Sequence, residues 1–258
     1  MSEGMVHYRR DGVIARITFD RPEARNAMTW TMYDQLYAAC DRVRADPELR
    51  VAVFRGAGGK AFVAGTDIGQ FREFKSGEDG VNYERRMSMY FGAVEALPVP
   101  TIAAIEGWAV GGGLMIAAAC DVRLATPGSR FGVPVARTLG NCLSIENYAV
   151  LAAVLGLART RRMLLLAENL TAEELLGAGF VAEIVPPSDL DARVEKLCSR
   201  LAGNAPITMR VTKESLRRLL HAGLPASEDL IRECYGSEDF RIGVASFLEK
   251  RDPVWTGK

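Results

Sequence analysis

The sequence predicts an α/β fold that ends in a helical region. Short β-branched or apolar segments alternate with segments of helical spacing up to about residue 185, and only helical spacing follows residue 189. The chain has 258 residues, of which 48% are hydrophobic and 25% charged. This composition is globular, and the length suffices to bury a sizeable core. We therefore expect a strand–helix core followed by C-terminal helices.

The first half of the chain predicts strands and helices in turn. Alternating, β-branched residues indicate a strand over residues 13–20, and the Arg21-Pro22 pair ends it. Apolar residues at positions 32, 36, 39, 40 and 43 have helical spacing and predict a helix from Thr29 to about Ala45. Further strands are expected at 51–55, 101–105 and 121–125, and further helices at 68–74, 81–97 and 114–120.

The second half predicts mostly helices. Helical spacing covers residues 145–155, 159–167 and 172–176, and a short apolar strand is expected at 181–185. From Asp189 the pattern stays helical to the end of the chain. We expect a core over residues 1–195 and a C-terminal helical region over residues 196–258.

The charge pattern argues against nucleic acid and membranes as partners. The 32 basic and 32 acidic residues cancel, so no overall field attracts a polyanion. The long uncharged run at residues 107–120 is shorter than the roughly 17–25 residues that cross a bilayer. The first residues contain no apolar stretch typical of a secretory leader.

Cysteine and histidine usage limits the chemistry. The chain has five cysteines without CxxC spacing, which favours a reducing, cytoplasmic location: Cys40, Cys120, Cys142, Cys198 and Cys234. Only two histidines are present, His7 and His221, and neither accompanies a GxSxG motif. We therefore expect neither a histidine-rich metal site nor a serine–histidine triad.

Three glycine-containing segments stand out. Gly56-x-Gly58-x-x-Ala61 formally matches a dinucleotide-binding motif, but no helix pattern opens inside it, so a surface turn is the better interpretation. In residues 64–68, a glycine permits close approach of a ligand to the backbone, and Asp67 can cap the following helix. The third segment, residues 111–113, is three consecutive glycines before an apolar helix. Its free amides and the helix dipole favour bound negative charge.

Together these segments resemble the crotonase (enoyl-CoA hydratase/isomerase) family. The matching stretches cover residues 13–255 and are Arg21-Pro-Glu-Ala-Arg-Asn-Ala27, Phe62-Val-Ala-Gly-Thr-Asp-Ile68, Ile105-Glu-Gly-Trp-Ala-Val-Gly-Gly-Gly113, Cys120-Asp121, Phe131-Gly132, Thr171-Ala-Glu-Glu, Gly179-Phe-Val and Ser246-Phe-Leu-Glu-Lys-Arg251. The resemblance implies a crotonase-like spiral of ββα repeats with a C-terminal helical region. It also implies a homotrimer or a dimer of trimers, with the acyl-CoA site in the core and the subunit contact in the C-terminal helical region, where residues 225–255 contain many apolar side chains.

The resemblance further implies an acyl-CoA thioester as substrate. Two backbone N–H groups would polarise the thioester carbonyl, and the matching positions are Thr66 and Gly112. No separate cofactor is implied, because coenzyme A arrives as part of the substrate. The family's CoA contacts match seven positions: Arg25, Ala27, Ala64, Asp67, Ile68, Phe247 and Lys250. Lys250 is equally well explained as a solvated surface charge.

The sequence departs from the family pattern at both catalytic glutamates of the hydratases. Met115 occupies one of these positions, and Val135 or Ala136, depending on alignment, occupies the other. Hydration needs one group that activates water and one that protonates carbon. Glu146 is the candidate acid–base residue, although an acidic residue in the first turn of a helix capped by Ser144 is also explained by the helix dipole.

Three classes of function follow from this pattern. We favour an acyl-CoA enzyme that stabilises a thioester enolate and is not an ordinary two-glutamate hydratase. The alternatives are a weak hydratase and a non-catalytic acyl-CoA-binding protein. Arg137 and Cys142 are lesser site candidates, Arg137 for a substrate carboxylate and Cys142 as a small buried apolar residue.

Overall fold

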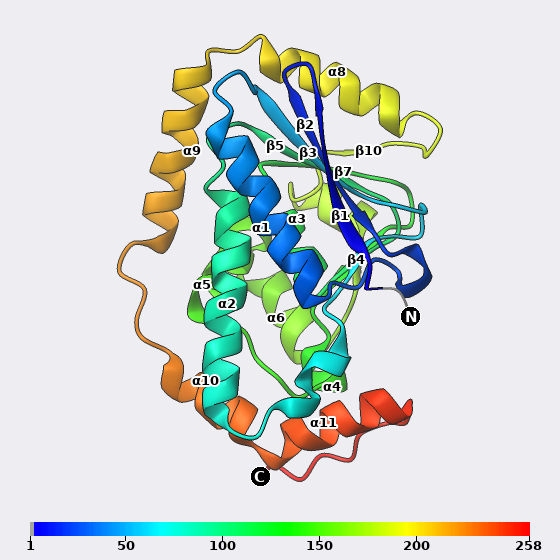
Figure 1. The fold of residues 1–258 in the computed structure, drawn as a ribbon. Coiled ribbons are helices and arrows are strands. Elements are labelled where there is room, and N and C mark those ends of the chain that lie inside the picture. The colour runs from blue at the N-terminus through cyan, green and yellow to red at the C-terminus, as the bar shows by residue number, and fades with distance from the viewer. Residues whose placement is uncertain (1–2) are drawn as a thin grey trace.

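The computed structural model describes residues 3–258 and contains two β-sheets surrounded by helices (Figure 1). The larger sheet has the order β1-β2-β3-β5-β7-β10, and the smaller has the order β4-β6-β8-β9. The strands of the larger sheet are β1 (Met5–Asp11), β2 (Ile14–Asp20), β3 (Val51–Gly56), β5 (Thr101–Ile105), β7 (Val122–Ala125) and β10 (Glu183–Ile184). Those of the smaller sheet are β4 (Ala61–Ala64), β6 (Trp108–Val110), β8 (Arg130–Gly132) and β9 (Leu170–Thr171). All pairs are parallel except β1 with β2 and β8 with β9.

The chain visits the two sheets in turn. After β3, β5 and β7 in the larger sheet it enters β4, β6 and β8 in the smaller one, and a helical segment follows each time. These helices are α2 (Gly77–Glu95, after the 3₁₀ turn η2 at Ile68–Glu73), α3 (Gly112–Ala119) and α4 (Val135–Thr138). The order confirms the predicted spiral of ββα repeats. The residues between Gly56 and Ala61, which formally match a dinucleotide-binding motif, form a turn between β3 and β4, as the sequence predicts.

The first helix shows why the predicted spacing holds. Helix α1 (Trp30–Ala45) begins at the Thr29 cap, whose Oγ1 accepts a hydrogen bond from the Met32 N–H at 3.2 Å. The apolar side chains at helical spacing, Met32, Leu36, Cys40 and Val43, are fully buried. The remaining helices of the core are η1 (Pro22–Ala24), α5 (Ile145–Leu155), α6 (Leu157–Leu165) and α7 (Ala172–Gly177).

Two helices begin earlier than the sequence predicts. Helix α2 starts four residues before position 81, because Ser76 and Asp79 form a reciprocal capping box. Helix α3 starts at Gly112 rather than at Leu114, so its first turn contains glycines. This earlier start places the Gly112 amide at the free N-terminal end of the helix.

The C-terminal helices cover different parts of the core (Figure 1). Helix α8 (Leu190–Ala202) packs on the larger sheet, and α9 (Pro206–His221) runs along one side. Helix α10 (Glu228–Gly236) packs against α2, and α11 (Glu238–Glu249) packs against η2 and α4. The boundary expected at residue 195 falls within α8, and the division into two regions stays a prediction. Within residues 3–258, no helix combines the length and apolar character needed to cross a membrane.

Candidate active site

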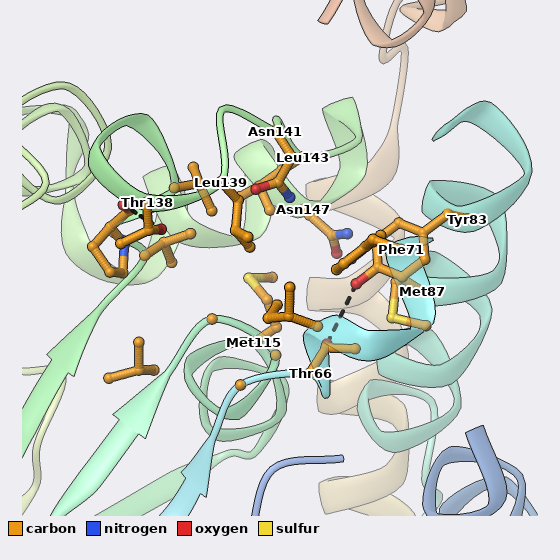
Figure 2. Close-up of a pocket in the computed structure, with 18 of the residues that line it drawn as sticks. Thr66, Phe71, Tyr83, Met87, Met115, Thr138, Leu139, Asn141, Leu143 and Asn147 are labelled. Atoms are coloured by element: carbon orange, nitrogen blue, oxygen red, sulfur yellow. Dashed lines mark hydrogen bonds between the residues drawn. The ribbon is translucent and has the colours of Figure 1, made fainter. Parts of the chain in front are cut away.

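A largely apolar pocket lies between η2, α2, the start of α3, the segment 133–143 and α11. Figure 2 shows Met115 and Thr66 on one side of this pocket and Asn141 and Leu143 on the opposite side. The described residues that line the pocket are Ala64, Gly65, Thr66, Ile68, Phe71, Tyr83, Glu84, Met87, Phe91, Val110, Gly111, Gly112, Met115, Val133, Pro134, Val135, Thr138, Leu139, Asn141, Leu143, Asn147 and Phe247.

Two free backbone amides lie together in this pocket. Thr66 follows β4, and Gly112 is the first residue of α3. A Cβ atom placed on Gly112 would lie 3.4 Å from the Thr66 Oγ1, so the two residues are neighbours. Among residues 3–258, neither the Thr66 N–H nor the Gly112 N–H has an acceptor. Two unpaired donors beside an apolar cavity can bind an oxygen that carries negative charge.

The consecutive glycines are explained by tight packing around the start of α3. Gly111 has a φ of +56°, which disfavours other residues. A Cβ on Gly113 would overlap the carbonyl group of Val63 in β4. Helix α3 therefore approaches the smaller sheet closely, and this approach brings its first amide to Thr66.

The Thr66 side chain is held by two tyrosines. Its Oγ1 lies 2.8 Å from the Tyr33 hydroxyl and 3.3 Å from the Tyr83 hydroxyl, the second of which Figure 2 marks. Both tyrosines are buried, and this burial raises the pKa of each well above its usual value. The hydroxyl network therefore stays neutral and fixes the Thr66 peptide.

The loop at residues 25–28 lies beside the end of β4, which Thr66 follows. The Ala64 N–H donates to the Arg25 carbonyl at 3.0 Å, and the Met28 N–H donates to the Gly65 carbonyl at 2.9 Å. The buried Arg21 guanidinium lies 2.8 Å from the Asp67 carboxylate and 3.1 Å from the Ala27 carbonyl. These contacts bring Arg25, Ala27 and Asp67 close to the end of β4, but of the four residues only Ala64 lines the pocket.

One carboxyl group enters the pocket from α2. Glu84 is 2% exposed, and it is the only acidic or basic side chain among the described residues that line the pocket. Its Oε1 accepts from the Tyr235 hydroxyl at 2.7 Å, and its Oε2 accepts from the Ser144 N–H at 2.8 Å. Burial raises the pKa of Glu84 to about 7, although these hydrogen bonds act in the opposite direction.

The structure brings together only part of the predicted site. Thr66, Gly112, Ala64, Ile68 and Phe247 line one pocket. Asp67 caps η2, accepting from the Gly69 N–H at 3.0 Å, and Lys250 is exposed at the end of α11.

Glu146 lies in the first turn of α5 and lines two neighbouring cavities instead of this pocket. Met115 and Val135 line the pocket, where the family's hydratases are expected to carry acids.

The sequence analysis missed Glu84, although a pattern marks it. Glu84 lies four residues after Gly80 and three before Met87, on the helical face that also contains Phe91 and Val94. A carboxylate on the apolar face of a helix is uncommon in a core unless it is hydrogen-bonded.

Comparisons with known proteins agree with the fold. The family model described as enoyl-CoA hydratase/isomerase matches residues 9–258. A short-chain-enoyl-CoA hydratase of Clostridium acetobutylicum is 30% identical, covering 94% of both chains. An (E)-benzylidenesuccinyl-CoA hydratase of Thauera aromatica is 33% identical, covering 95% of this chain and 96% of the relative. A solved structure of methylmalonyl-CoA decarboxylase in complex with 2-nitronate-propionyl-CoA superimposes with a TM-score of 0.89 at 26% identity, covering all of both chains.

Proposed function

Because the chain belongs to the enoyl-CoA hydratase/isomerase family, we propose that it binds acyl-CoA thioesters and stabilises the enolate formed at the thioester carbonyl. The observation that carries this proposal is the pair of unpaired N–H groups at Thr66 and Gly112, which lie side by side in an apolar pocket. A thioester oxygen placed between them accepts two hydrogen bonds without displacing any bond within the protein.

These amides act more strongly on the enolate than on the ground-state thioester. Negative charge develops on the oxygen as the enolate forms, and fixed donors in a water-poor site stabilise that charge. The Gly112 N–H also lies at the positive end of the α3 dipole. One such donor contributes roughly 3–4 kcal/mol to lowering an activation barrier.

The reaction is not ordinary two-glutamate hydration. Met115 is 1% exposed, and neither its thioether nor the Val135 side chain can activate water or protonate carbon. We propose instead a reaction that passes through the enolate and needs no separate cofactor.

The CoA portion binds along the edge that the 25–28 loop forms. Arg25, Ala27, Ala64, Asp67 and Ile68 supply this edge, and Phe247 of α11 covers the pocket from the other side. Lys250 follows at the end of α11, where its exposed ammonium can meet a CoA phosphate. We also propose a homotrimer or a dimer of trimers, located in the cytoplasm, where the five free cysteines stay reduced.

The test compares binding of propionyl-CoA with binding of 2-nitronate-propionyl-CoA, a planar anion that resembles a thioester enolate. We expect calorimetry to show at least 100-fold tighter binding of the nitronate, as for a transition-state mimic. Absence of binding to both ligands would contradict the proposed function. In a panel of enoyl-, dienoyl- and malonyl-type CoA esters, crotonyl-CoA should be hydrated poorly. Tight binding without turnover of any ester would indicate a non-catalytic binding protein, and rapid crotonyl-CoA hydration would indicate a hydratase.

A further inference from the structure

We infer that Glu84 is the catalytic residue that removes and returns the proton on the carbon next to the thioester carbonyl. This inference rests on the proposed function, because it needs a thioester bound at Thr66 and Gly112. Glu84 is the only ionisable acid or base among the described lining residues apart from the Tyr83 phenol, whose pKa is raised. A single carboxyl group must then act in both directions.

The contacts of Glu84 hold it in place without saturating it. Each of its oxygens accepts one hydrogen bond, from Tyr235 of α10 and from the Ser144 N–H before α5. The Asn147 side chain is a third donor that favours the ionised form. Since the two carboxylate oxygens together have four lone pairs, one position stays free. The carboxylate is thus oriented by two elements and remains able to take a proton.

The neighbours on α2 place Glu84 on the reacting side of the pocket. Tyr83 precedes it and contacts the Thr66 hydroxyl at 3.3 Å, and Met87 lies one turn further along. All three residues line the pocket that contains the two amides. A thioester held at those amides would therefore occupy the cavity that Glu84 borders.

Among the described residues that line the two cavities with Glu84, the only cation is Arg85, which pairs with Glu228 at 3.4 Å. Seven further titratable groups act on Glu84. These titratable groups come from α1, α2, the 141–148 segment and α10, and they are Tyr33, Tyr83, Cys142, Glu146, Tyr148, Cys234 and Tyr235. None of these seven groups is a base that could carry a positive charge. Burial and this surrounding keep the pKa of Glu84 at about 7, which suits a group that both accepts and donates a proton near neutral pH.

Glu84 also borders a second, more polar cavity. Ser88, Ser144 and Glu146 line that cavity together with Glu84. The Ser88 and Ser144 hydroxyls lie 2.8 Å apart. The carboxyl group can therefore exchange its proton with water on this side while a thioester fills the first pocket.

The proposed step balances without a further reactant. The bond between the α-carbon and its proton breaks, and the proton goes to a Glu84 oxygen. The electron pair of that bond forms the carbon–carbon double bond of the enolate, while the π pair of the carbonyl moves onto the oxygen held by the two amides. The same carboxylic acid then returns a proton to carbon as the enolate collapses. In D₂O the acid exchanges H for D before returning it, so the thioester acquires deuterium.

The experiment measures deuterium incorporation into propionyl-CoA in D₂O by mass spectrometry, for the wild type, Glu84→Gln and Glu146→Gln. We expect Glu84→Gln to lower the exchange rate by roughly 10²–10⁴-fold while it keeps the affinity for 2-nitronate-propionyl-CoA within a few-fold. Glu146→Gln should change exchange only a few-fold, through the lower pKa of Glu84 that results when this neighbouring charge is removed. The matched pair separates the two carboxylates, because an acid–base role for Glu146 predicts the opposite result.

A second variant keeps the carboxyl group. Tyr235→Phe removes a donor that favours the ionised form of Glu84, so the pH midpoint of exchange should rise by about 0.5–1 unit. A merely structural role for Glu84 would not move this midpoint.

Each remaining result is decisive. Three results would overturn the role of Glu84 and leave the proposed function standing. They are exchange by Glu84→Gln at the wild-type rate, an unchanged pH midpoint in Tyr235→Phe, and binding of the nitronate by the wild type without any exchange. If the wild type does not bind the nitronate, the proposed function itself fails.

Discussion

At the scale of single residues, the pocket depends on backbone groups that side chains hold in place. The Thr66 hydroxyl is the shared partner of two buried tyrosine hydroxyls, whereas the Thr66 N–H belongs to the peptide and has no acceptor among residues 3–258. Substitutions can therefore separate the amide from the side chain that supports it.

Replacing Thr66 by alanine should affect stability more than chemistry. The change leaves the Tyr33 and Tyr83 hydroxyls without their shared partner, which costs about 1–3 kcal/mol of unfolding free energy. Turnover by the folded protein should stay within a few-fold, because the N–H remains. Urea unfolding and steady-state kinetics measure the two effects, and Thr66→Ser, which keeps the hydroxyl, is the control. A 100-fold loss of turnover in Thr66→Ala would show that the side chain takes part in the chemistry.

Replacing Gly112 by proline should remove one donor outright. Proline fits the first position of a helix but has no N–H. Any Cβ at this position also presses on the Tyr33 hydroxyl, so Gly112→Ala is the matched control. We expect kcat/KM of the proline variant to be about 10²–10³-fold below that of the alanine variant. Equal activity of these two variants, with folding verified by circular dichroism, would exclude the Gly112 amide.

Glu84 should also make stability depend on pH. Its pKa is about 7 in the folded protein and 4.5 ordinarily, so the folded chain binds the proton more tightly than the unfolded chain does. The resulting stabilisation is complete below pH 4.5 and is lost as the pH rises through about 7. Compared with Glu84→Gln, the wild type should lose about 3 kcal/mol of unfolding free energy between pH 4.5 and pH 8. A constant difference between the two proteins over this range would contradict the raised pKa.

At the scale of elements, α11 attaches to the pocket through aromatic rings. Phe240 of α11 is 2% exposed, and its ring lies 5.9 Å from Phe71 and 4.8 Å from Tyr235, between ring centroids. Phe247 of the same helix is 47% exposed and lines the pocket. One helix thus carries a buried anchoring ring and a half-exposed ring that lines the pocket.

These two phenylalanines should respond differently to truncation. Phe240→Ala removes a buried ring and should cost about 3–5 kcal/mol of unfolding free energy. Phe247→Ala should change stability by less than about 1 kcal/mol and weaken thioester binding several-fold. Thermal unfolding and calorimetry with propionyl-CoA distinguish them. Similar stability losses in both variants would mean that α11 is not anchored through Phe240.

The elements differ in how well the sequence predicts them. Strands β2, β3, β5 and β7 and helices such as α1 and α5 follow from their apolar spacing, because one face or both faces are buried. The smaller sheet was not predicted, since its strands have two to four residues and form through pairing between distant segments. Strand β1 was also missed, because only Val6 in it is buried.

The same physical limit applies to the site. Thr66 and Gly112 are marked by local glycine motifs, and the structure brings both into one pocket. The role that we infer for Glu84 depends on Tyr235, which is 151 residues away in the sequence, and on Ser144, which is 60 residues away. Because these contacts join segments that are far apart in the sequence, no local pattern predicts them.

At the scale of the whole molecule, the structure changes which residues we propose for the subunit contact, from those after position 225 to those of α9. The sequence places many apolar residues after position 225, but Ile231, Tyr235, Phe240 and Val244 are buried within the chain itself. Helix α9 buries none of its residues and exposes four apolar side chains by 50% or more: Ile207, Val211, Leu216 and Leu219. An amphipathic helix of this kind requires a partner surface.

Light scattering should therefore find three or six times the 28.1 kDa mass of one chain at micromolar concentration. Replacing Leu216 and Leu219 by lysine should shift the mass toward a single chain, because two charges would enter the proposed contact. Leu157→Lys, at an exposed leucine on α6, is the control. A monomeric wild type at this concentration would contradict the proposed assembly.

The proposed use of peptide groups as oxyanion donors has a consequence for how such a protein changes over generations. A codon change at position 66 replaces a side chain, yet any residue other than proline still supplies the N–H. The proposed proton transfer depends on one carboxyl group of α2, which a single codon change can replace. Lineages that start from this scaffold can therefore acquire a different reaction by exchanging the acid–base side chain, while they inherit thioester activation unaltered.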